Sequence, residues 1–551
     1  MKIALAQLNY HIGHFEKNEK LITDAITKAK SQNAELVVFS ELCICGYPPH
    51  DLLERKEFVE ECVKSVERIA THCTDVAAIV GGPAINPNNK GKKLFNAAFF
   101  LHEGKIKQTF YKSLLPTYDV FDEYRYFEPN TSYDILEFKG KKMAVTICED
   151  IWENQPVANP FAQSRLYANS PMEKLIEKDP EIILNIASSP FSYVQEGTRK
   201  GVLRHNAEKY KIPVVYVNQV GANTELVFDG NSMVLDGDAQ LCLKCERFVE
   251  DLQYVDIDAL SPIEEVTVEA AEDYHIPLIN DALVLGIKDY FGKMGFKQAT
   301  LGLSGGIDSA VVVVLAVEAL GAENVRVLLM PSQFSSDHSV DDAVALAENL
   351  GIQYEIVAIK DIYEQFDQSL KPIFKDLPFN VAEENIQARI RGTLMMALSN
   401  KFGHILLNTT NKSEAAVGYG TLYGDMNGGI SVLGDVYKTD VFKLSRYMNR
   451  NGEVIPENTI VKPPSAELRP DQKDSDSLPD YDTLDGILYN YIELNRSPQE
   501  IESLGYDMAT ITKTVRLVNI NEYKRFQQAP ILRVSSKAFG FGRRIPLVAK
   551  Y

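Results

Sequence analysis

A chain of 551 residues is too long for one hydrophobic core, since domains typically hold about 100 to 250 residues, so two to four domains are expected. The net charge of −19 excludes a general nucleic-acid binder, which needs a basic face, but it allows a local phosphate site. No stretch approaches the roughly 20 apolar residues of a membrane span, and the N-terminus does not resemble a signal peptide. We therefore expect a cytoplasmic protein that binds neither nucleic acid nor membranes.

The seven cysteines form an odd number and have no spacing typical of a disulfide framework. Reduced thiols are therefore expected. The pairs Cys43/Cys45 and Cys242/Cys245 could form a zinc site, but no further ligands follow at a suitable spacing, which favours buried thiols.

The first half of the chain alternates apolar runs of strand length with helical patterns. A helical pattern covers about 16–32, and several strand-like runs are apolar on both faces, which indicates sheets covered by helices. The expected strands are Lys2–Leu8, Glu35–Ser40, Val76–Gly81, Ala97–Leu101, Met143–Ile147, Ile182–Ile186 and Val214–Val217. This region ends near residue 262.

From about residue 274 the pattern is βαβα, which predicts a doubly wound parallel sheet with chemistry at the carboxyl ends of its strands. Helices are expected at Asn280–Met294, Asp308–Leu320, Ser339–Leu350 and Glu384–Asn400, and strands at Ala299–Leu303, Val325–Met330, Tyr354–Ile359 and His404–Asn408. The stretch Lys462–Asp485 lacks periodicity and is rich in Pro, Asp and Ser. It is either a linker or a functional loop.

A glycine-rich turn lies where the strand 299–303 meets the following helix, with the sequence Ser304-Gly305-Gly306-Ile307-Asp308-Ser309. Glycines let the backbone approach an anion, and a helix N-terminus offers N–H groups that lack partners. Since a carboxylate beside a phosphate usually binds a bridging Mg²⁺, Asp308 is a candidate metal ligand. The alternative is a simple strand–helix turn with a capping serine.

This hexamer resembles the pyrophosphate-binding loop of the N-type ATP pyrophosphatases, which split ATP between its α- and β-phosphates and adenylate a substrate. Within that group, the series Thr409–Glu414, Gly418–Asp425 and Lys438 resembles the NAD synthetases. The resemblance implies ATP-binding residues at Gly302, Leu303, Ser304, Gly305, Gly306, Ile307, Asp308, Ser309, Thr409 and Lys438. It implies deamido-NAD⁺-binding residues at Asn385, Glu414, Asp425, Lys524 and Lys537, with Asp308 and Glu414 at Mg²⁺ and Ser465 near the adenylated intermediate.

In the first half, Cys148 follows an apolar strand, where a lone cysteine is usually a core residue. Glu41 also ends a strand, and Lys112 precedes a proline-ordered loop. Together the three resemble the Glu-Lys-Cys triad of the nitrilase superfamily. The resemblance implies C–N bond hydrolysis in which Cys148 attacks an amide, Glu41 transfers protons and Lys112 stabilises the oxyanion.

The same resemblance implies that Tyr118, Glu149, Ser189 and Gln195 bind the glutamine substrate. The family commonly carries a lysine or arginine where this sequence has Gln195. The glutamine carboxylate therefore needs another partner, such as Arg199.

The fold class implied is α/β, with a four-layer αββα nitrilase-like sandwich over 1–262 and a doubly wound, Rossmann-like ATP pyrophosphatase domain over 263–551. The substrates implied are deamido-NAD⁺, ATP and glutamine, with ammonia passing through a channel, and we expect a homo-oligomer. One alternative is another glutamine-dependent synthetase, such as a GMP or asparagine synthetase, but the Cys-His-Glu or N-terminal Cys glutaminase of those enzymes is not seen. The other is a nitrilase-like scaffold with vestigial sites.

Overall fold

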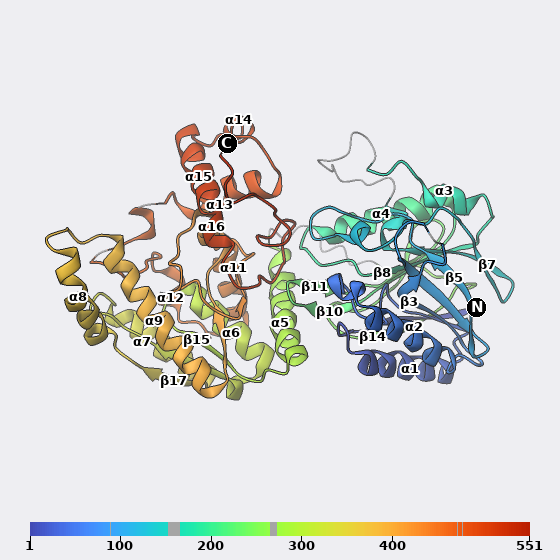
Figure 1. Ribbon diagram of the computed structural model, residues 1–551, viewed down its shortest axis with the longest axis horizontal. Coiled ribbons are helices and arrows are strands. Elements are labelled where there is room, and N and C mark those ends of the chain that lie inside the picture. Colours follow the sequence, from blue (N-terminus) through green and yellow to red (C-terminus); the bar gives the residue numbers. More distant parts are fainter. Residues whose placement is uncertain (89, 153–165, 265–272, 471, 477, 551) are drawn as a thin grey trace. The chain divides into compact units, whose positions relative to one another are not determined.

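The computed structural model describes residues 1–551 except 89, 153–165, 265–272, 471, 477 and 551. The chain forms two compact units, Met1–Glu269 and Ala270–Tyr551 (Figure 1). Among the helices of the described residues, none combines the length and apolarity needed to cross a bilayer.

The first unit contains two six-stranded mixed sheets. One has the order β14-β1-β2-β3-β4-β5 and the other the order β13-β12-β9-β8-β7-β6, while β10 and β11 form a separate hairpin. The strands are β1 Lys2–Gln7, β2 Leu36–Val38, β3 Ala77–Ile85, β4 Leu94–His102, β5 Lys105–Tyr111, β6 Leu136–Phe138, β7 Lys141–Ile147, β8 Ile182–Ala187, β9 Val214–Asn218, β10 Val220–Asn223, β11 Leu226–Asp229, β12 Met233–Leu235, β13 Leu241–Lys244 and β14 Asp251–Asp256.

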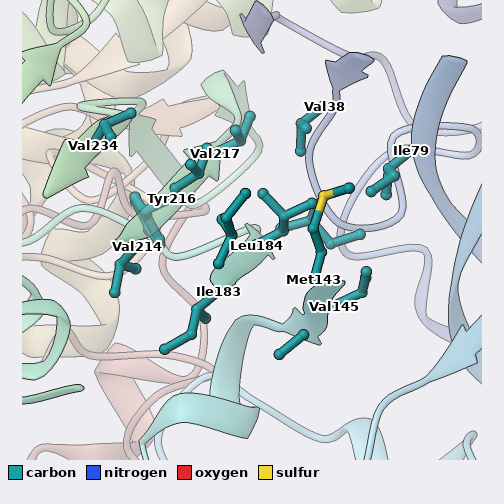
Figure 2. Packing of buried hydrophobic residues seen from close by; sticks show 14 of the residues in the cluster. Val38, Ile79, Met143, Val145, Ile183, Leu184, Val214, Tyr216, Val217 and Val234 are labelled. Carbon is teal, nitrogen blue, oxygen red and sulfur yellow. The ribbon is translucent and has the colours of Figure 1, made fainter. Parts of the chain in front are cut away.

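Alternation along the strands explains how the sheets are covered on both faces. Ile3 and Leu5 point into a core shared by the two sheets, whereas Ala4 and Ala6 point into a second core shared with the helices α1 (Phe15–Ser31) and α2 (Lys56–Ala70). Figure 2 shows the shared core, with Ile79 of one sheet near Met143 and Val145 of the other.

Helices α1 Phe15–Ser31 and α2 Lys56–Ala70 cover the first sheet, and α3 Pro171–Ile176 and α4 Gln195–Tyr210 pack on the second. Short 3₁₀ turns lie at His50–Glu54, Glu123–Arg125 and Cys148–Ile151. This arrangement is the predicted four-layer αββα sandwich, which is confirmed. The edge strand β14 was not predicted. Its residues are largely polar, and its partner β1 lies about 250 residues earlier in the chain.

The second unit is built on a five-stranded sheet with the order β17-β16-β15-β18-β19, and every pair in it is parallel. The strands are β15 Ala299–Gly302, β16 Val325–Leu329, β17 Gln353–Ile356, β18 Ile405–Asn408 and β19 Ile430–Ser431. Strand order reverses beside β15, so the loop after β15 opens at the topological switch point. The predicted doubly wound fold is confirmed.

The helices of the second unit are α5 His275–Met294, α6 Ile307–Leu320, α7 Asp337–Leu350, α8 Lys360–Phe374, α9 Val381–Phe402, α10 Lys412–Val417, α11 Lys438–Met448, α12 Glu457–Val461, α13 Tyr481–Leu488, α14 Pro498–Glu502, α15 Met508–Ile520 and α16 Glu522–Arg525. Shorter turns lie at Ala322–Asn324, Asn449–Asn451 and Asp474–Asp476, and a π-helical turn at Tyr489–Glu493.

Several predicted boundaries in this unit were wrong. The helices expected to begin at Asn280 and Glu384 begin at His275 and Val381. The strand expected to reach Ile359 ends at Ile356, because Ile359 already begins the turn into α8. The aperiodic stretch expected to run to Asp485 ends at Asp480, whose side chain accepts a hydrogen bond from the Thr483 amide and so caps α13.

The turn between β15 and α6 requires glycine at one position. Gly305 has a φ of +79°, which side chains with a Cβ rarely adopt. A Cβ there would also lie 2.1 Å from the carbonyl oxygen of Ser339 in α7. The loop therefore packs directly against the backbone of α7.

We expect Gly305→Ala to lower the free energy of unfolding more than Gly351→Ala. Gly351 has a similar φ of +64° but no atom within 4 Å of its Cβ position, so it reports the backbone strain alone, about 1–3 kcal/mol. Gly305→Ala should cost about 1–3 kcal/mol more, because α7 or the loop must move. Urea unfolding of both variants measures the difference, and equal costs would contradict the close packing.

Candidate active sites

Cys148 lies at the carboxyl end of β7, in the first position of a 3₁₀ turn. Its φ is +44°, a conformation that is uncommon for non-glycine residues and recurs at functional sites. The side chain is 7% exposed. Asp150 helps to hold this turn, since its carboxylate accepts hydrogen bonds from the amides of Ile147 and Ser113 at 3.1 and 2.8 Å. The turn is thereby tied to the segment that carries Lys112.

Lys112 is fully buried between two carboxylates. Its Nζ donates to Glu41 Oε1 at 2.7 Å and to both carboxylate oxygens of Glu123, at 2.9 and 2.7 Å. Asn96 donates to Glu41 at 2.7 Å, and the amide of Ser188 donates to its other oxygen at 3.0 Å. Glu41 is thus fixed by three donors from three different segments.

Burial and these charges together shift the pKa of the Cys148 thiol. Burial raises the pKa of its thiol well above the usual value, and the Glu41 carboxylate raises it further, whereas the Lys112 ammonium lowers it. Burial alone would lower the pKa of Lys112, but Glu123 and Glu41 raise it above its usual value. The resting cysteine is therefore a thiol beside a carboxylate that can take its proton.

Among the predicted glutamine-binding residues, Tyr118 and Glu149 lie together. The hydroxyl of Tyr118 donates to Glu149 Oε1 at 2.8 Å, and Tyr167, which was not predicted, donates to the same oxygen at 2.9 Å. Burial raises the pKa of Glu149 to about 7, although both tyrosine hydrogen bonds lower it. A carboxylate in this setting suits the binding of an ammonium group.

Ser189 is buried, and its amide donates to the Asn218 side chain at 2.9 Å. Gln195 is the first residue of α4 and is half-buried. Arg199, one turn further on, was considered as a partner of the glutamine carboxylate. The structure argues against this role, because Arg199 is buried and its guanidinium donates to both oxygens of Asp229, at 3.2 and 2.9 Å.

In the second unit, a pocket of about 340 Å³ opens at the carboxyl ends of β15, β16 and β18. Most of the predicted ATP and metal residues line it: Gly302, Leu303, Ser304, Gly306, Ile307, Asp308, Ser309, Thr409, Glu414, Asp425 and Lys438. Gly305 turns its backbone against α7 instead, and Asn385, Lys524 and Lys537 do not line the pocket. Segment 462–468, which includes Ser465, forms part of its wall.

The carboxylates of Asp308 and Glu414 converge on Lys438. The Lys438 Nζ forms an ion pair with Asp308 and lies 3.3 Å from Glu414 Oε1. Asn411 donates to Asp308 Oδ1 at 2.9 Å and accepts from the Glu414 amide at 2.9 Å, so one side chain orients both. Burial raises the pKa of Glu414 to about 8, although Lys438 lowers it.

This donor set fits Mg²⁺, which is usually held by one or two carboxylates together with phosphate oxygens. Two carboxylates already face one cationic atom at the edge of a pocket that the glycine-rich loop also lines. The described residues contain no group of three or more His, Cys, Asp or Glu side chains arranged around a metal. Further ligands for a divalent ion would therefore come from phosphate or water.

Three of the residues predicted for the dinucleotide meet at the loop 418–425. Thr421 donates through its amide to Asp425 at 2.7 Å and through its hydroxyl to Asn385 at 2.8 Å. Lys524 donates to the carbonyls of Gly418 and Gly420, at 2.7 and 2.9 Å.

Lys537 lies at a different cluster, where its carbonyl accepts a hydrogen bond from the buried Lys412 at 2.9 Å. Lys412 also contacts Asp435 at 2.9 Å and Glu493 at 2.8 Å. This cluster anchors α10, the helix that carries Glu414, to the C-terminal segment.

Several residues at the two sites were not assigned from the sequence, namely Asn96, Glu123, Asp150, Tyr167, Arg391 and Asn411. Only the fold shows which charges Glu123 and Arg391 face. Tyr167 follows the undescribed stretch 153–165 and has no motif signal of its own.

Comparisons with known proteins match the two units to two different families. Residues 2–262 match the family model of carbon–nitrogen hydrolases and residues 279–528 that of NAD synthases. Fold and sites thus define a carbon–nitrogen hydrolase unit joined to an NAD synthase unit.

Relatives match this chain over nearly its whole length. The glutamine-dependent NAD(+) synthetase of Synechocystis sp. is 45% identical, with 100% of this chain and 99% of the relative covered, and that of Acinetobacter baylyi is 41% identical, with 99% and 98% covered. The solved structure of glutamine-dependent NAD⁺ synthetase from Acinetobacter baumannii in complex with ADP has a TM-score of 0.77 and 38% identity, covering 99% of this chain and 98% of that one. The chain belongs to the glutamine-dependent NAD(+) synthetase family.

We expect Lys112→Met to destabilise the first unit, because Glu41 and Glu123 would remain buried without their shared cation. Breaking a buried ion pair costs about 3–5 kcal/mol. The loss should be smaller at pH 5 than at pH 8, since a carboxyl that takes up a proton no longer repels its neighbour. Adding Glu123→Gln should recover part of the stability. Urea unfolding at both pH values checks this, and a loss that does not depend on pH would contradict it.

Proposed function

We propose that this chain makes NAD⁺ from deamido-NAD⁺ in the last step of NAD biosynthesis. In this reaction ATP activates the substrate, glutamine supplies the nitrogen, and AMP, diphosphate and glutamate are released. The observation that carries the proposal is the convergence of Asp308, Glu414 and Lys438 beside the glycine-rich loop, in a chain whose other unit presents Cys148 beside Glu41.

The first unit releases ammonia from glutamine. Glu41 takes the proton of Cys148 as the sulfur attacks the side-chain amide carbon, and later gives a proton to the departing ammonia. Lys112 stabilises the oxyanion through its charge, since its N–H groups already donate to Glu41 and Glu123. Water then hydrolyses the γ-glutamyl thioester to glutamate.

Binding of glutamine is assigned to the residues around Cys148. Glu149, held by Tyr118, is placed to bind the α-ammonium group, and Ser189 and Gln195 complete the proposed set. Because Arg199 is already paired with Asp229, the side chain of Gln195 at the start of α4 remains the proposed contact of the glutamine carboxylate.

The second unit activates the nicotinate carboxylate, which is a poor electrophile until AMP is attached. Serine hydroxyls and backbone amides of the loop 302–309, with Thr409, hold the ATP phosphates, and Lys438 neutralises the departing pyrophosphate. The residues Asn385, Asp425, Lys524 and Lys537 are proposed to bind deamido-NAD⁺. Ammonia then displaces AMP from the adenylated carboxylate, in a site that must exclude water.

Asp308 and Glu414 are proposed to hold Mg²⁺, which supplies Lewis-acid stabilisation of charge on the phosphates. The relative from Acinetobacter baumannii, described in complex with ADP, supports adenine-nucleotide binding by this fold. We also propose that the chain works in the cytoplasm as a homo-oligomer. Exposed apolar side chains at Ile373, Leu377 and Phe379 support self-association.

Two substitutions separate the two activities. Cys148→Ala should abolish NAD⁺ formation with glutamine but keep it with ammonium chloride, because the nucleophile is needed only for glutamine. Asp308→Asn should reduce NAD⁺ formation with either nitrogen source by roughly 100-fold or more, while glutamine hydrolysis persists. Chromatographic measurement of NAD⁺ and glutamate checks both.

Cys242→Ala is the matched control, since this thiol is partly exposed on β13 and should leave both activities unchanged. Loss of ammonium-dependent synthesis in Cys148→Ala would contradict the assignment of separate chemical roles. Failure of the unaltered protein to form NAD⁺ from either nitrogen source would overturn the proposed function.

A further inference from the structure

Arg391 brings a guanidinium group to the nucleotide pocket from α9, an element that carries none of the predicted ATP-binding residues (α9 is labelled in Figure 1). Its Nε donates to the carbonyl of Met330 at 3.0 Å, which fixes the plane of the guanidinium. Met330 follows β16, and β16 pairs with β15, the strand that leads into the glycine-rich loop. Arg391 is therefore anchored at the same edge of the sheet as that loop.

The other basic side chains of this pocket are already neutralised. Lys438 faces Asp308 and Glu414, and Lys462 forms an ion pair with Asp342 at 3.1 Å. Arg391 forms no ion pair within the described part of the chain, and its terminal nitrogens have no hydrogen-bond acceptor there. It is the one pocket-lining cation, among the described residues, whose charge has no carboxylate in contact.

Leaving such a charge uncompensated is costly. Burial lowers the pKa of Arg391 to about 10, although the more distant carboxylates of Asp425 and Glu467 raise it. The side chain remains charged at neutral pH, and a partly buried cation without a counter-ion is destabilising. A ligand that carries an anion would remove this cost on binding.

We propose that Arg391 binds the α-phosphate of ATP, the phosphate that stays on the adenylated intermediate. The two terminal nitrogens of a guanidinium match two phosphate oxygens, whereas an ammonium offers only a point charge. In the proposed function Lys438 already neutralises the pyrophosphate that leaves, so the α-phosphate still lacks a cationic partner. Arg391 instead donates to Met330 and lines the same pocket as Asp425, a residue proposed to bind the second substrate. The inference deepens the proposed function and rests on it.

Calorimetric binding of ATP, AMP and adenosine to the full chain tests the proposal. Arg391→Gln should weaken ATP and AMP binding by roughly 10- to 100-fold, the range expected for hydrogen bonds to a charged group, and leave adenosine binding unchanged. Arg391→Lys should recover part of the loss, because lysine restores the positive charge but not the paired N–H groups of the guanidinium. Lys401→Gln, an exposed position on the same helix, is the control for removing a cation.

Unchanged adenosine binding also shows that the pocket is intact, which a merely structural role of Arg391 would not allow. A loss shared by adenosine, a loss restricted to ATP, or no loss at all would each overturn the assignment to the α-phosphate. Equal ATP binding by the unaltered protein and Arg391→Gln would overturn this assignment alone. Absence of ATP binding to the unaltered protein would overturn the proposed function itself.

Discussion

A buried lysine held between two carboxylates is the interaction on which both chemical centres depend. An ammonium group out of water is stable only where anions surround it, so each such lysine fixes the elements that carry its partners. The three clusters are Lys112 with Glu41 and Glu123, Lys438 with Asp308 and Glu414, and Lys412 with Asp435 and Glu493. The first two contain proposed reacting groups, and the third anchors the helix that carries Glu414.

The same arrangement serves different chemistry in the two units. Beside Cys148, burial and then the carboxylate of Glu41 raise the pKa of the thiol, while Lys112 supplies the opposing charge. Beside the glycine-rich loop, Lys438 holds two carboxylates together that would otherwise repel each other. The lysines thus allow acidic groups to remain buried close to the reacting atoms. Removing the lysine or a carboxylate would leave an unpaired buried charge and destabilise the unit.

Sequence patterns were sufficient to locate a site whose residues are contiguous in the chain. Cys148 and the loop 304–309 stand at strand ends that apolar periodicity marks clearly, and the structure places both as expected. Pairings that depend on the tertiary fold were not accessible. Arg199 lies one helical turn after Gln195, on the same face of α4, but its guanidinium is paired with Asp229, a partner 30 residues further along the chain. Glu123 likewise becomes a partner of Lys112 only in the folded chain. The partners of Arg199 and Lys112 depend on which residues are close in space, and one sequence alone does not show this.

The most direct test of the account is the origin of the amide nitrogen in the product. Mass spectrometry of a reaction that contains deamido-NAD⁺, ATP and glutamine labelled with ¹⁵N at the side-chain amide should show NAD⁺ one mass unit heavier, with AMP and diphosphate formed in equal amounts. Unlabelled NAD⁺, or diphosphate release with xanthosine monophosphate but not with deamido-NAD⁺, would contradict the account.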